Sequence, residues 1–108
     1  MKVAPHVYTQ ASDLQRLRGY VADLDNGAHV ELELADGERV AGIVAARPQL
    51  LTFLDAAGVE GTNGSVRIEM PALNSPEATA GPWDIWLDRI VRIRRLAPVG
   101  AGGARTLH

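Results

Sequence analysis

Few of the residues that could carry out chemistry are spaced for it in this chain of 108 residues. The histidines His6, His29 and His108 share no metal-ligand spacing, so we expect no metal site. Glu31 and Glu33 stand two apart, and an exposed acidic strand face explains them better than an acid–base pair, because nothing near them predicts a buried site. We therefore expect a protein that is not an enzyme and uses no cofactor.

The strongest candidate for a binding surface is a basic run near the end of the chain, formed by Arg89, Arg92, Arg94 and Arg95. Arginines that neutralise phosphates, beside aromatic rings that stack on bases, are typical of proteins that bind single-stranded nucleic acid. Alternating arginines are also typical of the solvated face of a strand, where they would pair across the sheet with Glu31, Glu33 or Glu69. Both interpretations stay open.

Two tryptophans precede this basic run. Trp83 and Trp86 differ by three positions, so they point to opposite faces of a regular strand. We expect one of them in the core and the other at a rim or interface. Trp86 lies on the same side as Asp84 and Asp88, which makes it our interface candidate.

The composition is that of an ordinary globular protein, with 46% hydrophobic and 22% charged residues. The absence of cysteine excludes disulfides, thiolate metal sites and cysteine nucleophiles. The amino-terminal stretch lacks the apolar core of a signal peptide, and no run approaches the roughly 18 apolar residues of a membrane span, so we expect a cytoplasmic protein with no membrane partner. A formal net charge of -2 gives no overall attraction to nucleic acid.

The first regular element predicted is a helix that begins at Ser12, after an extended lead-in over residues 1–11. Ser12 with Gln15 matches a capping box, in which the two side chains satisfy orphan backbone N–H groups. Asn26 and Gly27 supply the left-handed residue with which helices commonly end. Apolar residues recur between these limits at helical spacing, at Leu14, Leu17, Val21 and Leu24.

Residues 30–44 predict a β-hairpin. Apolar and polar residues alternate in the first strand, which is typical of a strand with one buried face. Asp36 and Gly37 supply the positive φ that a tight hairpin turn needs. Gly42, in the middle of the second strand, marks a sharp bend or a close approach of another backbone.

The remaining elements are predicted in outline. Residues 50–54 read as an apolar strand that continues the second one, residues 56–65 as a turn with a left-handed position, and residues 66–70 as a third main strand. A loop follows over residues 71–82. Residues 83–96 predict two short strands or one kinked strand, because the alternation changes phase at residues 88–90, as at a bulge or a 3₁₀ turn. Residues 98–108 form a glycine-rich tail.

Taken together, these elements resemble the Sm-like fold. The acidic-glycine turn at Asp36 and Gly37, and the glycine of the second strand at Gly42, stand where that family has them. More closely, the whole chain is similar to a small group of uncharacterised bacterial proteins that carry a variant Sm-like barrel with a lengthened middle region. The resemblance implies a mainly β protein: an N-terminal α-helix followed by a five-stranded, strongly bent antiparallel barrel, in one domain over residues 12–97.

The resemblance also implies binding or assembly as the function. Sm-like proteins typically form rings and bind single-stranded RNA through the loop after the second strand and the corner before the last, where this chain has Asn63, Asp88 and Arg89. Asp88 would repel phosphate, and Asn63 before Gly64 is also typical of a left-handed turn.

Two functions therefore stay open. The first is an RNA-binding module, with Asn63, Arg89, Arg92 and Arg94 as candidate contacts. The second is a protein-interaction barrel without nucleic-acid binding. Edge strands offer a route to self-association. We expect a monomer or a dimer in preference to a ring.

Overall fold

The structure is a computed structural model that describes residues 2–69 and 82–96. One helix, α1 (Ala11–Asp23), precedes the strands. The strands and the single 3₁₀ turn are β1 (His29–Leu34), β2 (Arg39–Val44), β3 (Leu51–Leu54), β4 (Glu60–Asn63), β5 (Ser65–Glu69), β6 (Trp83–Trp86), η1 (Leu87–Arg89) and β7 (Ile90–Arg95). The predicted loop over residues 71–82 and the tail over residues 98–108 lie almost entirely outside the described residues.

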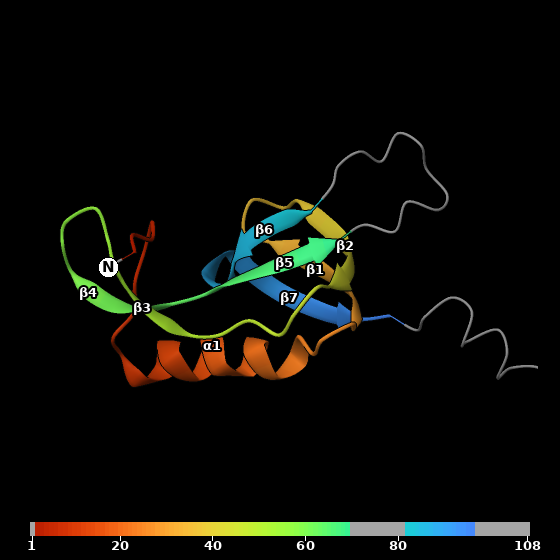
Figure 1. Ribbon diagram of the computed structural model, residues 1–108, viewed down its shortest axis with the longest axis horizontal. Helices are drawn as coiled ribbons and strands as arrows, with labels where there is room; N and C mark the ends of the chain where they lie inside the picture. Colours follow the sequence, from red (N-terminus) through yellow and green to blue (C-terminus); the bar gives the residue numbers. More distant parts are fainter. Residues whose placement is uncertain (1, 70–81, 97–108) are drawn as a thin grey trace, which may run out of the picture.

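The main sheet has five antiparallel strands in the order β6-β5-β2-β1-β7. This confirms the predicted mainly β, five-stranded architecture. Strands β6 and β7 form its two edges and do not pair with each other in the described ranges, so the sheet curves without closing. Figure 1 shows α1 lying along one side of the sheet, where Leu17 and Leu24 are fully buried in the core.

The β1–β2 hairpin confirms the predicted alternation. Val30, Leu32 and Leu34 are buried, while the residues between them are half-exposed. Gly37 has a φ of 90° in the turn, and the Asp36 carboxylate accepts a hydrogen bond from the backbone N–H of Glu38 at 3.0 Å. The side-chain pattern and the turn chemistry thus favour the same register.

Gly42 is a point of close backbone approach, as predicted. A methyl group at this position would lie 2.5 Å from the carbonyl oxygen of Glu69 and 2.7 Å from a methyl carbon of Ile68. Both residues belong to β5, which pairs with β2 in the next two positions, Ile43 and Val44. Only glycine leaves room for this close approach of the two strands.

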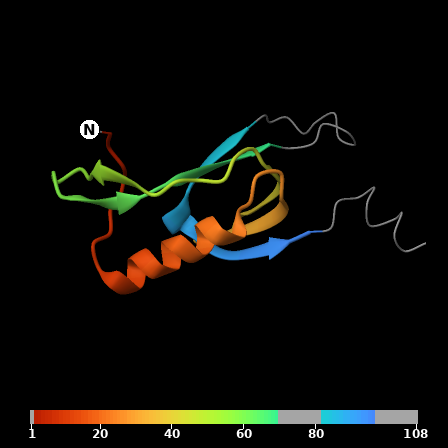
Figure 2. The same cartoon turned by 60° about the horizontal axis from the view of Figure 1, so that its bottom comes forward.

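The middle of the chain differs from the prediction. Residues 56–65, predicted as a turn, contain the turn glycine Gly58 (φ 82°) but also strand β4, which pairs with β3 in a separate two-stranded sheet. Strand β3 does not continue β2, because residues 45–50 between them have no regular structure. Figure 2 shows the β3–β4 ribbon projecting beyond the main sheet.

The N-terminal segment, residues 2–8, crosses this ribbon, and we name it the strap. Val3 bridges Leu54 on β3, and Tyr8 bridges Thr62 on β4 through two backbone hydrogen bonds of 2.9 Å. Gly61 lies beneath the strap, since a methyl group there would be 2.9 Å from the side chain of Val7. The lead-in is therefore extended, as predicted, and is paired with the ribbon.

The predicted ends of the helix were wrong. The helix begins at Ala11, after Gln10, and no side chain caps it, so Ser12 lies inside the first turn and forms no capping box. The helix ends at Asp23, where the backbone N–H of Leu24 bonds the carbonyl of Val21. Gly27 does have a positive φ of 76°, but in the following turn, where its N–H bonds Val44 on β2.

The end of the described chain follows the sequence pattern. Ile85, Leu87 and Ile90 are buried, and the change of phase between them is the 3₁₀ turn η1. The Tyr20 hydroxyl of α1 donates to the carbonyl of Ile90 at 2.8 Å, which fastens the helix to the start of β7.

Candidate functional site

The two segments implied by the Sm-like resemblance meet at one end of the sheet. Asn63 is 0% exposed, and its side-chain N–H group donates to the carbonyl of His6 at 2.8 Å and to the Asp88 carboxylate at 3.2 Å. Its side-chain oxygen accepts from the N–H of Gly64 at 2.8 Å. No described residue other than glycine has a positive φ, so the reading of Asn63 as a left-handed turn residue was wrong.

The strap covers this corner. The Tyr8 hydroxyl donates to the second oxygen of the Asp88 carboxylate at 2.9 Å. Burial raises the pKa of the Tyr8 phenol, and the bond to Asp88 raises it further. Asp88, Asn63 and Tyr8 therefore form a satisfied internal cluster, which we name the corner cluster, with no accessible surface on Asn63 for a ligand.

The arginines of the basic run face carboxylates. Their ion pairs are Arg89 with Asp36 at 3.0 Å, Arg92 with Glu33 at 3.8 Å, Arg94 with Glu31 at 2.8 Å and Arg95 with Asp25 at 3.1 Å. Two of these pairs join β7 to β1 across the sheet, which confirms the predicted pairing with Glu31 and Glu33. The arginines are exposed, so each pair contributes under about 1 kcal/mol to stability.

A different surface brings together aromatic, aliphatic and basic side chains. This groove of about 610 Å³ lies between the strap, the β2–β3 connection and strands β5 and β6. We name it the Trp86 groove. Its lining includes Lys2, Val3, Arg47, Leu51, Phe53, Arg67, Asp84 and Trp86.

Trp86 is the aromatic centre of this groove. Its ring meets the ring of Phe53 edge to face, with centroids 5.3 Å apart and planes at 82°. Trp86 is half-buried, whereas Trp83 is 41% exposed. The expectation that one tryptophan belongs to the core was wrong: the buried residue of this edge strand is Ile85, which points inward between them.

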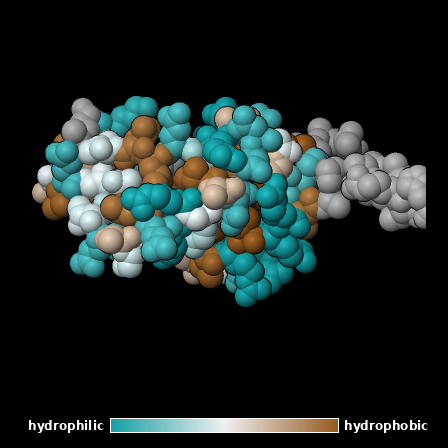
Figure 3. All heavy atoms as spheres, turned by 90° about the horizontal axis from the view of Figure 1, so that it is seen from below, coloured by the Kyte–Doolittle hydropathy of each residue, from teal (hydrophilic) through white to brown (hydrophobic). Residues whose placement is uncertain are grey.

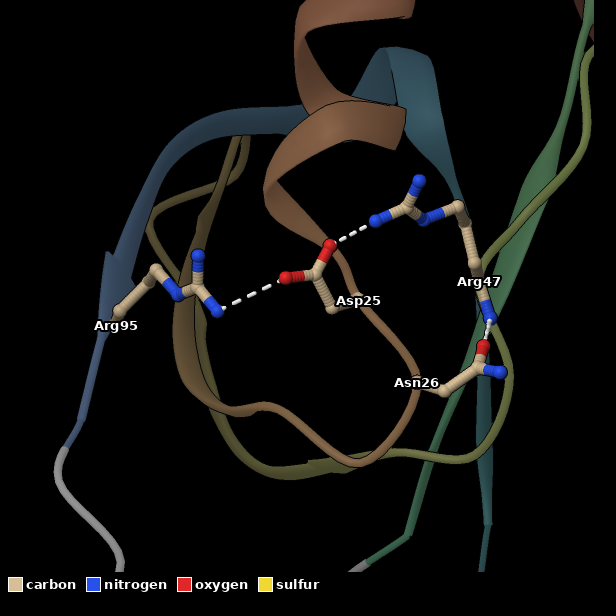
Figure 4. A network of polar contacts seen from close by, with 4 residues as sticks. All are labelled: Asp25, Asn26, Arg47 and Arg95. Atoms are coloured by element: carbon tan, nitrogen blue, oxygen red, sulfur yellow. Dashed lines mark hydrogen bonds and ion pairs between the residues drawn. The ribbon is translucent and has the colours of Figure 1, made fainter.

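The basic residues of the groove come from separate elements. Arg47 lies in the segment after β2. Its guanidinium donates a hydrogen bond to Asp25, and its backbone N–H donates one to the side chain of Asn26 (Figure 4). Arg47 and Arg95 flank Asp25, and the hydrogen bond from Arg47 is the largest cause of the lowered pKa of that carboxyl. Nothing in the sequence pattern singles out Arg47, because the contacts that place it in the same groove as Trp86 are between segments far apart in the chain.

The opposite wall of the groove carries an arginine of its own. Arg67 on β5 pairs with Asp84 on β6, with contacts of 3.2 and 3.4 Å. Both side chains are more than half exposed. Sequence reasoning missed Arg67 as a site residue, since its alternation with Val66 and Ile68 indicates only the outer face of a strand.

Other kinds of site are not seen in the described part of the chain. Within residues 2–69 and 82–96, no group of three or more His, Cys, Asp or Glu residues is placed to hold a metal ion. Over the same residues, no helix has the length and apolar character needed to span a membrane. Figure 3, which views the molecule from the helix side, shows apolar patches interspersed with hydrophilic side chains.

The bent five-stranded sheet, with a 3₁₀ turn between its two edge strands and a helix before the first strand, defines a small protein of the Sm-like class. Residues 1–96 match the family described as Domain of unknown function (DUF3247), and the chain belongs to this family.

A solved structure supports the same assignment. The chain is similar to XC5848 from Xanthomonas campestris, described as adopting a novel variant of Sm-like motif, with 40% identity and a TM-score of 0.78. The similarity covers 89% of this chain and 98% of that one. Comparison with curated proteins gives no match. The resemblance seen in the sequence is thereby confirmed, and this fold and family support a non-enzymatic binding module.

Proposed function

We propose that this protein is a cytoplasmic interaction module that binds a segment of a partner protein in the Trp86 groove. The observation that carries the proposal is the half-buried Trp86, packed on Phe53 beside exposed aliphatic side chains: Leu51 is 45% exposed and Val3 is 66% exposed. Tryptophan and arginine are the residues most enriched among the energetic centres of protein interfaces. Exposed apolar residues that gather at a groove are typical of interaction sites.

Single-stranded RNA is the second candidate. Lys2, Arg47 and Arg67 around Trp86 give the combination of cations and an aromatic ring that binds such strands. The positions that Sm-like proteins use for RNA offer a poorer site in this chain than the groove does. Asn63 has no accessible surface, and Asp88 adds a negative charge at the corner. Arg89, Arg92 and Arg94 already face carboxylates, which lowers their attraction for phosphate.

For the assembly state we propose a monomer or dimer. Among the described residues, strands β6 and β7 form the edges of the sheet, where a second copy could pair. The corner between these strands has no glycine, and the strap and the β3–β4 ribbon add bulk beside it. The mass in solution tests this directly, and a hexamer or heptamer would contradict it.

Site-specific photocrosslinking tests the proposed function. Photoreactive benzoylphenylalanine would replace Gln49, an exposed residue of the groove, and in a control Val91, which is exposed on β7 outside it. We expect a protein adduct from the Gln49 position in cells that is lost in the Trp86→Ala variant, with none from Val91. Equal adducts from both positions, or an adduct that ribonuclease removes, would contradict the proposal.

A further inference from the structure

We infer that the segment bound in the Trp86 groove is an extended acidic peptide that carries apolar residues between its carboxylates. This inference rests on the proposed function and names the chemistry of the partner. It follows from the charge of the groove, from its aliphatic side and from the way in which Arg47 is held.

The groove has an excess of positive charge. Lys2, Arg47 and Arg67 line it, and Asp84 is the one carboxylate among the described lining residues, while Asp25, outside the lining, pairs with Arg47. Asp84 occupies only part of the donor capacity of Arg67, since the contacts at 3.2 and 3.4 Å use two of the N–H groups of a guanidinium that has five. Because this pair is also exposed to solvent, a carboxylate of a ligand can add to it at little cost.

Arg47, at the margin of the groove, is held in place by its own partners. Asp25 and Asn26, in the turn after α1, bind its guanidinium and its backbone N–H (Figure 4). Arg47 itself is 51% exposed in its side chain. A cation fixed in this way loses less conformational entropy when it meets a ligand carboxylate than a free side chain would.

The aliphatic side of the groove distinguishes a peptide from RNA. Val3 and Leu51 are exposed beside Phe53 and Trp86, and they offer contact area for leucine-like side chains. A base gains most from the open face of an aromatic ring. Trp86 is half-buried against Phe53, so it offers less open ring than a stacking platform does. Alternating carboxylates and apolar side chains match both kinds of surface.

Anisotropy of a fluorescent peptide tests the inference. The probe is a short, end-blocked peptide of glutamates around two leucines, compared with the same peptide carrying glutamines and with labelled poly(U). We expect the glutamate peptide to bind about tenfold more tightly than the glutamine peptide, because several charge-assisted contacts are lost together. We also expect poly(U) to bind more weakly than the glutamate peptide.

Two arginine variants provide a matched comparison. Arg67 and Arg94 are both exposed strand residues paired with one carboxylate, at 3.2 and 2.8 Å, but only Arg67 lines the groove. We expect Arg67→Gln to weaken binding of the glutamate peptide about fivefold and Arg94→Gln to leave it unchanged. Equal effects of the two substitutions would overturn the inference.

The outcomes separate the inference from the proposed function. Equal affinity for the glutamine and glutamate peptides would overturn the acidic partner, while a groove-specific protein adduct from Gln49 would still support the interaction module. Tighter binding of poly(U) than of either peptide would overturn the inference in favour of RNA. Loss of the Gln49 adduct together with retained peptide binding would instead count against the proposed function alone.

Discussion

The side chain of Asn63 donates a hydrogen bond to Asp88 at 3.2 Å, and it does so with no surface exposed to solvent. These are residues that the Sm-like resemblance implied for RNA recognition. Here they bind each other, the strap and the backbone of Gly64. The segments around Asn63 and Asp88 therefore lie together in this fold, and their contacts stabilise the structure.

This arrangement predicts a large loss of stability for Asn63→Ala. The substitution leaves the carbonyl of His6 and the N–H of Gly64 without their side-chain partner, and we expect a loss of about 2 kcal/mol in the free energy of unfolding. Asn26→Ala is the matched control, because Asn26 is exposed and accepts one bond. Denaturant unfolding measures both, and equal effects would contradict the structural role of Asn63.

Tyr8 predicts a change of stability in alkali. Its pKa is raised above the ordinary 10.0 by burial and by the Asp88 carboxylate. The contribution of the protonated Tyr8 hydroxyl to the free energy of unfolding is therefore complete below about pH 10. It is lost as the pH rises through the higher pKa of Tyr8 in the folded state. We expect the free energy of unfolding to fall with rising pH above 10, and to fall less steeply in Tyr8→Phe. Identical slopes for the two proteins would rule this out.

Gly42 and Gly19 predict opposite effects of one substitution. Gly42→Ala places a methyl group 2.5 Å from the Glu69 carbonyl, so we expect it to cost at least about 2 kcal/mol. Gly19 lies exposed in α1 with nothing within 4 Å of an added methyl group, so Gly19→Ala should stabilise by about 0.5–1 kcal/mol. Thermal unfolding of both variants provides the comparison. A tolerated Gly42→Ala would mean that β5 does not approach β2 as closely as 2.5 Å implies.

Asp25 predicts a dependence of stability on acid. Its pKa is lowered from 3.8, first by the bond from Arg47 and then by Arg95. The contribution of the ionised Asp25 carboxylate to the free energy of unfolding is thus present above pH 3.8. It is lost as the pH falls through the lower pKa of Asp25 in the folded state. We expect Arg47→Gln to raise the carboxyl pKa of Asp25, measured by NMR, more than Arg95→Gln does. The reverse order would show that Arg95 is the dominant partner.

Much of this fold was predictable where the signal is local. The alternation around Val30 and Leu32 was sufficient for the hairpin, and the glycine at position 42 for the close approach of another backbone. Strand β4 was missed because its sequence, Glu60 to Asn63, contains no apolar residue, and it is formed by pairing with β3 and with Tyr8. Such non-local pairing leaves no periodicity to read.

The candidate site was predictable only in its aromatic centre. Trp86 stands out as a large ring on the same side of its strand as Asp84 and Asp88. Lys2, Arg47 and Arg67 come from the strap, from the segment after β2 and from β5, and only the folded chain brings them to one groove. Asn63 shows the opposite case, since a polar residue before glycine is typical of an exposed turn, yet three hydrogen bonds hold it in the interior.

The central claim is that the Trp86 groove binds a partner segment, and the two tryptophans test it within one spectrum. Their indole N–H groups give separate NMR signals, which Trp83→Phe assigns. On titration with the glutamate peptide, we expect the Trp86 indole signal to move with saturation while the Trp83 signal stays in place. A shift of Trp83 alone, or no shift of Trp86 at a peptide concentration that saturates the anisotropy signal, would contradict the assignment of the groove as the binding site.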